Sequence, residues 1–144
     1  IFDVDGVLAP IEYGVYNHYE LDDEAWAKAL ATNDFYTDRI PFKTFQDFLS
    51  KRNILNVYVA TKVMNEIEKE QKIHYLEKNY GILRDHVFEV YKNEDKLEVL
   101  RKIKEKYSDL DDKYFVMIDD TIEVLNYIME NSNFSTVHVS SFLK

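Results

Sequence analysis

Five short apolar segments, separated by stretches with helical periodicity, constrain the fold of this chain more than any other feature. The segments are 1–5, 56–60, 86–91, 114–118 and 135–139. Short apolar runs are typical of buried strands, and strands that alternate with helices indicate a parallel sheet. We therefore expect an α/β fold, a three-layer Rossmann-like parallel sheet of about five strands with helices on both faces.

The stretches between these segments predict the helices and one insertion. Helices are expected at 22–30, from Pro41 onward, between Thr61 and Tyr80, at 95–107 and at 121–131. Gly81 ends the third of these, and Ile67 is expected on its inner face. The segment near 9–40 is too long for an ordinary strand-to-helix connection. We therefore expect a single domain over residues 1–144 with a small helical cap near 9–40.

Composition and charge narrow the function classes. The net charge of −9 argues against binding to DNA or RNA, because that binding depends on basic side chains that neutralise phosphates. The longest apolar runs fall short of the roughly 20 residues needed to span a bilayer, and no signal peptide is visible. Cysteine is absent, which fits a reducing compartment. We expect a cytoplasmic protein that binds neither nucleic acid polymers nor membranes.

Acidic and hydroxyl side chains follow three of the predicted strands. Asp3 and Asp5 stand at the end of the first, Thr61 ends the second, and Asp119 and Asp120 end the fourth. Ligands of open parallel sheets bind outside the carboxyl ends of the strands, so these groups should converge. Four carboxylates brought together repel one another unless a cation lies among them. Oxygen ligands favour Mg²⁺.

Several of these segments resemble the signatures of the haloacid dehalogenase-like hydrolases. DVDGVLA at 3–9 is similar to their first signature, an apolar strand followed by DxDG[TV], and NVYVAT at 56–61 is similar to the second. VMIDDTIEVL at 116–125 resembles the fourth, an apolar strand ending in two acids. The third signature is a lysine before that strand, for which Lys96 fits best and Lys92 is the alternative.

The resemblance implies a phosphatase and assigns catalytic roles. Asp3 would be the nucleophile that forms an aspartyl-phosphate, and Asp5 the general acid and base. Family members that act as dehalogenases lack an acid at the position of Asp5. Gly6 would let the chain turn so that both carboxylates face one pocket. Thr61 would bind phosphoryl oxygens at the start of the following helix, and Lys96 would balance the charge on Asp3.

The same resemblance implies a Mg²⁺ site and a substrate site. The metal would be held by Asp3, the carbonyl of Asp5, Asp119 and Asp120. The substrate would be a small phosphorylated metabolite, such as a nucleotide or a sugar phosphate. The candidate substrate-binding residues are Gly6, Thr61, Lys62, Tyr16 and His18, with Glu12 and Tyr13 as further cap candidates.

Structural roles compete with these functional ones. Asp119 or Asp120 could cap the helix that begins near residue 121, and Thr61 could likewise be a helix cap. Lys96 could be a surface lysine, and the aromatic residues of the cap could pack it onto the core. The whole chain could also be a non-enzymatic phosphate-binding or phospho-accepting domain that resembles response-regulator receivers, although receivers lack DxDGV.

Overall fold

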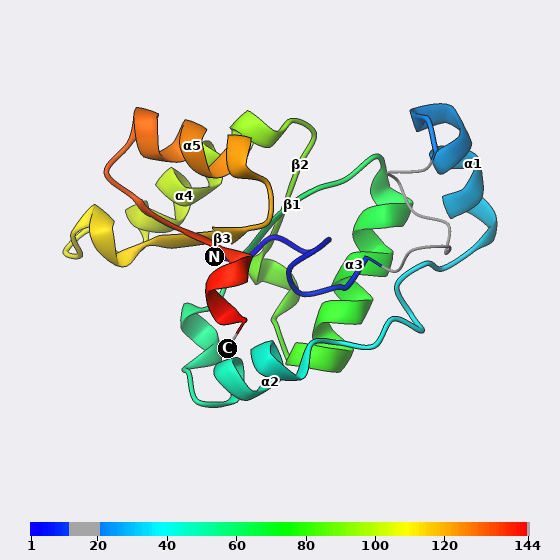
Figure 1. The fold of residues 1–144 in the computed structure, drawn as a ribbon, viewed down its shortest axis with the longest axis horizontal. Helices are drawn as coiled ribbons and strands as arrows, with labels where there is room; N and C mark the ends of the chain where they lie inside the picture. The colour runs from blue at the N-terminus through cyan, green and yellow to red at the C-terminus, as the bar shows by residue number, and fades with distance from the viewer. Residues whose placement is uncertain (12–20, 144) are drawn as a thin grey trace.

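The computed structural model describes residues 1–11 and 21–143 of the chain (Figure 1). Its α-helices are α1 (Asp23–Thr32), α2 (Lys43–Ser50), α3 (Glu66–Tyr80), α4 (Lys96–Glu105) and α5 (Ile122–Asn131). Its strands are β1 (Val59–Lys62), β2 (Val87–Val90), β3 (Val116–Asp119) and β4 (Ser135–His138). Short 3-10 turns lie at Ile54–Asn56, Arg84–His86, Asn93–Asp95, Asp112–Tyr114 and Val139–Phe142.

The strands form two parallel pairs, which corrects the expected architecture. β1 pairs with β2, with Val59 opposite Val87, and β3 pairs with β4, with Val116 opposite Ser135. The described residues therefore contain two short two-stranded sheets. The prediction of a three-layer, Rossmann-like sheet of about five strands is wrong.

The segment expected to be the first strand lies between the two pairs but is not a strand (Figure 1). Phe2 forms isolated parallel bridges to Val59 and to Ile118. The chain then leaves the strand direction, because the carbonyl of Val4 accepts hydrogen bonds from the amides of residues 7–9 and closes a tight turn. Extended pairing thus stops after about one residue on each side, too short for a strand.

The buried core is divided by the alternating side chains around β1. Val59 belongs to a cluster with residues of α2 and α3, such as Phe45 and Leu76. Ala60 points the other way, into a cluster with residues of α4 and α5, such as Leu100. Alternation is the normal geometry of an extended chain. It aims neighbouring residues of the same segment at different groups of helices.

Helix α3 carries clear local signals at both ends. The side chain of Asn65 accepts a hydrogen bond from the amide of Glu68, which caps the first turn. Gly81 ends the helix with a left-handed φ of 66°, a conformation that costs glycine little. The expected inner position Ile67 is wrong, because this side chain is 45% exposed.

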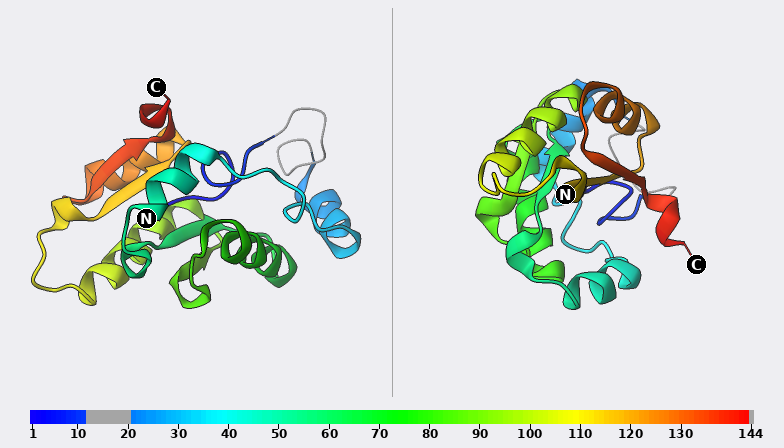
Figure 2. Two further views of the ribbon diagram at one scale, coloured as in Figure 1. Left: turned by 90° about the horizontal axis from the view of Figure 1, so that it is seen from below. Right: turned by 90° about the vertical axis from the view of Figure 1, so that its left-hand side faces the viewer.

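Helix α1 lies at the end of the molecule away from β4, beside α3 (Figures 1 and 2). It belongs to the segment near 9–40 that the sequence predicts to be a cap. Asp22 caps its first turn by accepting a hydrogen bond from the amide of Ala25. Residues 33–42 then lead from α1 to α2 and bring Tyr36 into the buried interior.

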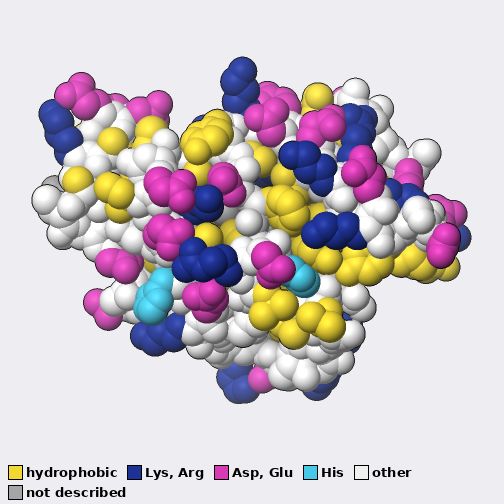
Figure 3. All heavy atoms as spheres, turned by 180° about the vertical axis from the view of Figure 1, so that it is seen from behind, with side chains coloured by type: hydrophobic (Ala, Val, Ile, Leu, Met, Phe, Trp, Pro, Cys, Tyr) yellow, Lys and Arg dark blue, Asp and Glu magenta, His cyan; other side chains and the backbone are white. Residues whose placement is uncertain are grey.

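The described surface gives two further facts. Within residues 1–11 and 21–143, no helix combines the length and the apolar character needed to cross a membrane. On the face seen in Figure 3, acidic and basic side chains lie interspersed around apolar ones. That face therefore offers no continuous basic surface of the kind that binds nucleic acid.

Candidate active site

Three carboxylates from two distant segments of the chain meet at the ends of the first segment and β3. One oxygen each of Asp3, Asp119 and Asp120 lies within 4.8 Å of the other two. Asp3 and Asp119 are buried, with 8% and 0% of their surfaces exposed, and Asp120 is half-buried. Apolar strand residues that precede them deliver these charges into a site with little water, where charges without a counter-ion are costly.

Lys96, the first residue of α4, supplies a counter-ion. Its Nζ lies 2.8 Å from Oδ2 of Asp119 and 3.1 Å from Oδ1 of Asp3. The side chain is only 2% exposed, so it is not a surface lysine. The alternative, Lys92, is exposed. The structure thus places Lys96, rather than Lys92, against the acid cluster.

The cluster shifts the pKa values of its members. The pKa of Asp3 is raised to about 6, mainly because burial outweighs the opposing charge of Lys96, with a smaller upward contribution from Asp119. Burial and the charge of Asp119 also raise the pKa of Asp120. Burial alone would lower the pKa of Lys96, but the charges of Asp3 and Asp119 outweigh it and raise that pKa. Lys96 therefore stays cationic, and the acids gain from any further cation.

Gly6 has a steric role in addition to the expected one in the chain turn. Its φ is 76°, and a Cβ at this position would lie 2.2 Å from Oδ2 of Asp120. Such a contact is impossible, so any larger residue would displace the carboxylate. Gly6 thus makes room for Asp120 in the cluster, while the chain turn itself also needs the left-handed conformation. His138 lies near the same acid and hydrogen-bonds through Nε2 to the carbonyl of Asp120 at 3.1 Å.

Each carboxylate oxygen of Asp119 has a different partner; the residue is not the helix cap considered from the sequence, because the N-cap of α5 is Thr121 and has no side-chain cap hydrogen bond. Oδ1 of Asp119 accepts a hydrogen bond of 2.9 Å from the amide of Thr121, the residue that precedes α5. Its Oδ2 binds Lys96. Each oxygen has its own partner, so the structural contact at the start of α5 also fixes the carboxylate that faces Lys96 and Asp3.

The carboxylate of Asp5 lies outside the group of three, which corrects the expected convergence of four carboxylates. Lys72 Nζ lies 2.8 Å from its Oδ2, and Arg39 Nη1 lies 3.0 Å from its Oδ1. The hydroxyl of Tyr36 donates to Oδ1 at 2.9 Å. Asp3 and Asp5, two positions apart in the sequence, thus lie in different environments, because side chains of α3 and of the α1–α2 connection surround only Asp5.

Thr61 lies within β1 and not at the start of a helix, which corrects the prediction for this residue. Helix α3 begins five residues later and is capped by Asn65. The amide of Met64 already donates to Oε2 of Glu68 at 2.6 Å. The first turn of α3 therefore lies further along the chain than Thr61, and the carboxylate of Glu68 binds the amide just before it. The hydroxyl of Thr61 is buried and accepts a hydrogen bond of 3.1 Å from Lys72.

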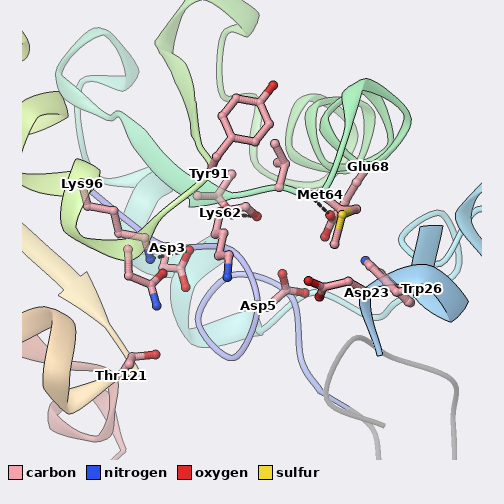
Figure 4. A pocket seen from close by; sticks show the side chains of 13 residues that line it. Asp3, Asp5, Asp23, Trp26, Lys62, Met64, Glu68, Tyr91, Lys96 and Thr121 are labelled. Carbon is pink, nitrogen blue, oxygen red and sulfur yellow. Dashed lines mark hydrogen bonds and ion pairs between the residues drawn. The ribbon is translucent and has the colours of Figure 1, made fainter. Parts of the chain in front are cut away.

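A cavity of about 510 Å³ opens above these groups (Figure 4). Asp3 and Lys96 lie on one side, Asp23 and Trp26 of α1 lie on the other, and Asp5 lies between them. The exposed Lys62 extends into the space between Asp3 and Asp5 in Figure 4. The remaining walls come from residues 61–64 and from Glu68, Tyr91, Asn93 and Thr121. The volume is typical of a site for a small metabolite.

Two of the predicted substrate-binding residues, Tyr16 and His18, lie outside the described residues, as do Glu12 and Tyr13. The other end of the expected cap does reach the cavity, through Asp23 and Trp26.

Four residues around Asp5 were not predicted from the sequence: Tyr36, Arg39, Glu68 and Lys72. A pattern in α3 could have indicated two of them. Glu68, Lys72 and Tyr75 follow one another at spacings of four and three, so they share one helix face. All three are buried. Charged residues on the same face as a buried tyrosine indicate an ion pair in the interior rather than a solvated surface.

The cluster of Asp3, Asp119 and Asp120 fits a hard divalent cation. Its ligands are all oxygens, which Mg²⁺ prefers. Oxygens bound to one Mg²⁺ at about 2.1 Å lie at most about 4.2 Å apart, so ligand atoms within 4.8 Å of one another need only small shifts. Three carboxylates against the one lysine beside them also leave a net negative charge. The carboxylate of Asp5 does not contribute to this group.

Comparison with known proteins does not assign this chain to a family. No model of a known protein family matches the chain, and no curated protein matches it. The resemblance to the haloacid dehalogenase-like hydrolases therefore stays a prediction from short motifs, and the geometry of the site has to support a function by itself.

Proposed function

We propose that this chain is a magnesium-dependent phosphatase of the haloacid dehalogenase-like type, which hydrolyses a small phosphomonoester through an aspartyl-phosphate on Asp3. One observation carries the proposal: Asp3 lies buried at the wall of a cavity, in contact with Lys96 and close to Asp119 and Asp120. A nucleophile, a lysine and a pair of acids are the parts that this chemistry needs.

Asp3 has an oxygen available for attack. Its Oδ1 lies 3.1 Å from Nζ of Lys96, and no side-chain hydrogen bond joins its Oδ2 to a described residue. In the first step, a carboxylate oxygen of Asp3 bonds to phosphorus and the bond from phosphorus to the ester oxygen breaks. The leaving alkoxide needs a proton. Covalent catalysis of this kind divides one difficult transfer into two easier ones.

Asp5 lines the same cavity and, in its protonated form, would supply that proton. In the second step Asp5 takes a proton from water as the water oxygen attacks phosphorus. The bond between phosphorus and Asp3 then breaks, which releases inorganic phosphate, restores the carboxylate of Asp3 and leaves Asp5 protonated. Because Asp5 gives and then recovers one proton, it ends each cycle in its initial state.

Positive charge near Asp3 would stabilise the transferring group. Lys62 extends into the cavity without an ion pair to a described residue and could contact phosphoryl oxygens. Asp3, Asp119 and Asp120 would hold Mg²⁺. When bound, Mg²⁺ would neutralise charge on the phosphoryl oxygens and orient them.

The cavity also bears on the substrate. Its volume of about 510 Å³ accommodates a small metabolite but not a folded polymer. Trp26 and Tyr91 supply aromatic surface, and Asp23 supplies a carboxylate. Nucleotides and sugar phosphates both fit this description, since a base could pack on the aromatic groups and sugar hydroxyls could bind the acids.

Release of 4-nitrophenol from 4-nitrophenyl phosphate tests the proposal. We expect turnover with Mg²⁺, none with EDTA, and loss of turnover in Asp3→Asn. Asp109 is exposed, so Asp109→Asn serves as a matched control that removes the same charge and keeps activity. Circular dichroism would verify that each variant folds.

Two outcomes would contradict the proposal. A stable phospho-adduct without turnover would favour the receiver-like alternative. Turnover that survives Asp3→Asn would show that another group attacks phosphorus.

A further inference from the structure

The ion cluster around Asp5 contains more contacts than charge neutralisation requires. Two cations, Lys72 and Arg39, bind different oxygens of the carboxylate, at 2.8 Å and 3.0 Å. The hydroxyl of Tyr36 lies 2.9 Å and 3.2 Å from the two oxygens. These groups come from α3 and from the α1–α2 connection, so Asp5 is held from two separate parts of the chain.

Lys72 also joins Asp5 to Thr61. Its Nζ donates to Oγ1 of Thr61 at 3.1 Å and to the carbonyl of Lys62 at 2.6 Å. Only 1% of its side chain is exposed, so it cannot reach solvent as a surface lysine would. Glu68 balances part of its charge at 3.3 Å. One ammonium group thus fixes the distance between two residues of the cavity wall.

Tyr36 is suited to orient a carboxylate. It is fully buried, with 0% of its surface exposed. Burial, together with the charges of Asp5 and Glu68, raises its pKa well above the usual value, so the phenol keeps its proton and remains a donor. The ring of Tyr36 lies against Arg39, whose guanidinium carbon is 4.3 Å from the ring centroid. The Tyr36 ring thus helps to hold the Arg39 guanidinium, and both groups contact Asp5.

Stability alone does not explain such a cluster. Buried ion pairs contribute little net stability, because desolvation offsets their attraction, and apolar residues of similar size often serve as well. What a polar cluster does provide is a fixed direction for each group. Proton transfer in catalysis depends on that direction, since a misplacement of about 1 Å can reduce the rate about 100-fold.

We infer that Tyr36 and Lys72 are positioning residues, which hold the carboxyl group of Asp5 at the cavity wall so that it meets the leaving oxygen of the substrate. The inference rests on the proposed function. It assigns no contact with substrate to either residue, because both act through Asp5.

The inference predicts a specific kinetic effect. A poor leaving group needs a proton as its bond to phosphorus breaks, whereas a good leaving group departs with little help. Misplacing Asp5 should therefore reduce kcat/KM much more for phenyl phosphate than for 4-nitrophenyl phosphate. The two esters have nearly the same shape, so a general disturbance of the fold or cavity would affect both alike.

Tyr36→Phe is the most informative variant, because it removes only the hydroxyl. We expect kcat/KM for phenyl phosphate to fall about tenfold, as the loss of one hydrogen bond to a carboxylate implies, and to fall markedly less for 4-nitrophenyl phosphate. Tyr75→Phe is the matched control. Its hydroxyl is also buried, but it donates to the carbonyl of Leu8, which Tyr80 also binds. This variant should leave the ratio between the two esters unchanged.

Lys72→Met should widen the ratio between the esters further. Among the described residues, Lys72→Met leaves the buried Glu68 without its cation and Asp5 with Arg39 as its only cation. If that variant does not fold, Tyr36→Phe decides. If Tyr36→Phe loses kcat/KM equally on both esters, or loses none, the positioning role is overturned. Turnover by the wild-type protein would still support the proposed function in that case. A wild-type protein that hydrolyses neither ester would overturn both.

Discussion

Replacing Lys96 by methionine tests the electrostatics of the acid cluster most fully. Methionine keeps much of the length of lysine but lacks the charge, so Asp3 and Asp119 lose a cation at 3.1 Å and 2.8 Å. All three groups are buried, and removing one partner from a buried ion pair typically costs about 3–5 kcal/mol. A domain of this size has a total stability of about 5–15 kcal/mol. We expect the Mg²⁺-free variant to be close to unfolding.

Urea denaturation in EDTA, with and without added Mg²⁺, measures this effect. Lys92→Met is the matched control, because Lys92 is exposed and should change stability by no more than about 0.5 kcal/mol. Added Mg²⁺ should stabilise Lys96→Met more than wild type, since the variant leaves three acids without a cation. At a Mg²⁺ concentration 100 times the dissociation constant of the variant, binding should raise the free energy of unfolding of Lys96→Met by about 2.7 kcal/mol. A Lys96→Met variant as stable as Lys92→Met would refute the reasoning.

Two more perturbations address the same site. Asp3 has an ordinary pKa of 3.8 and a folded pKa of about 6. Between these pH values the folded state therefore binds more protons than the unfolded state. As the pH rises through this range, Asp3 lowers the stability of the fold. Without Mg²⁺, wild type should therefore lose about 2 kcal/mol relative to Asp3→Asn between pH 4 and pH 6, as measured by urea denaturation; a constant difference would contradict the shifted pKa. Gly6→Ala should lose Mg²⁺ binding in calorimetry, because its Cβ would displace Asp120, whereas Gly81→Ala, which has open space around it, should lose only about 1–2 kcal/mol of stability to backbone strain and keep the metal. Equal Mg²⁺ binding in the two alanine variants would contradict the steric role of Gly6.

The acid cluster was predictable because it depends on local pattern. Asp3, Asp119 and Asp120 each end an apolar run, and such ends meet at one edge when the strands are parallel. Lys96 was harder to distinguish from Lys92, since both lie in the same lysine-rich stretch. In the structure Lys96 is buried and Lys92 is exposed. The sequence could not show this difference, because burial depends on how the chain packs and not on the residue type.

Other features depended on the course of the backbone. The first segment was expected to pair as a full strand, but the turn that begins at Val4 ends the pairing after Phe2. Thr61 was expected at a helix start, but Asn65 caps the helix and sets its first residue further on. A short sequence window cannot tell which of several polar residues forms the cap.

The residues around Asp5 were the least accessible to sequence reasoning. Tyr36 and Arg39 lie more than 30 positions from Asp5, in a connection without helical or strand periodicity. Only the folded chain shows that this connection returns to the cavity. Lys72 gave a weak indication through its place on the buried face of α3, next to Tyr75.

The direct test of the central claim is to locate the phosphorylated residue. An aspartyl-phosphate is an acyl phosphate, which borohydride reduces to homoserine, so a rapidly quenched reaction followed by peptide mass spectrometry identifies the side chain. The proposed mechanism predicts homoserine at position 3 in the presence of Mg²⁺ and a phosphomonoester, and none in EDTA. Homoserine at position 5, 119 or 120 would contradict it, as would steady turnover without modification of any aspartate.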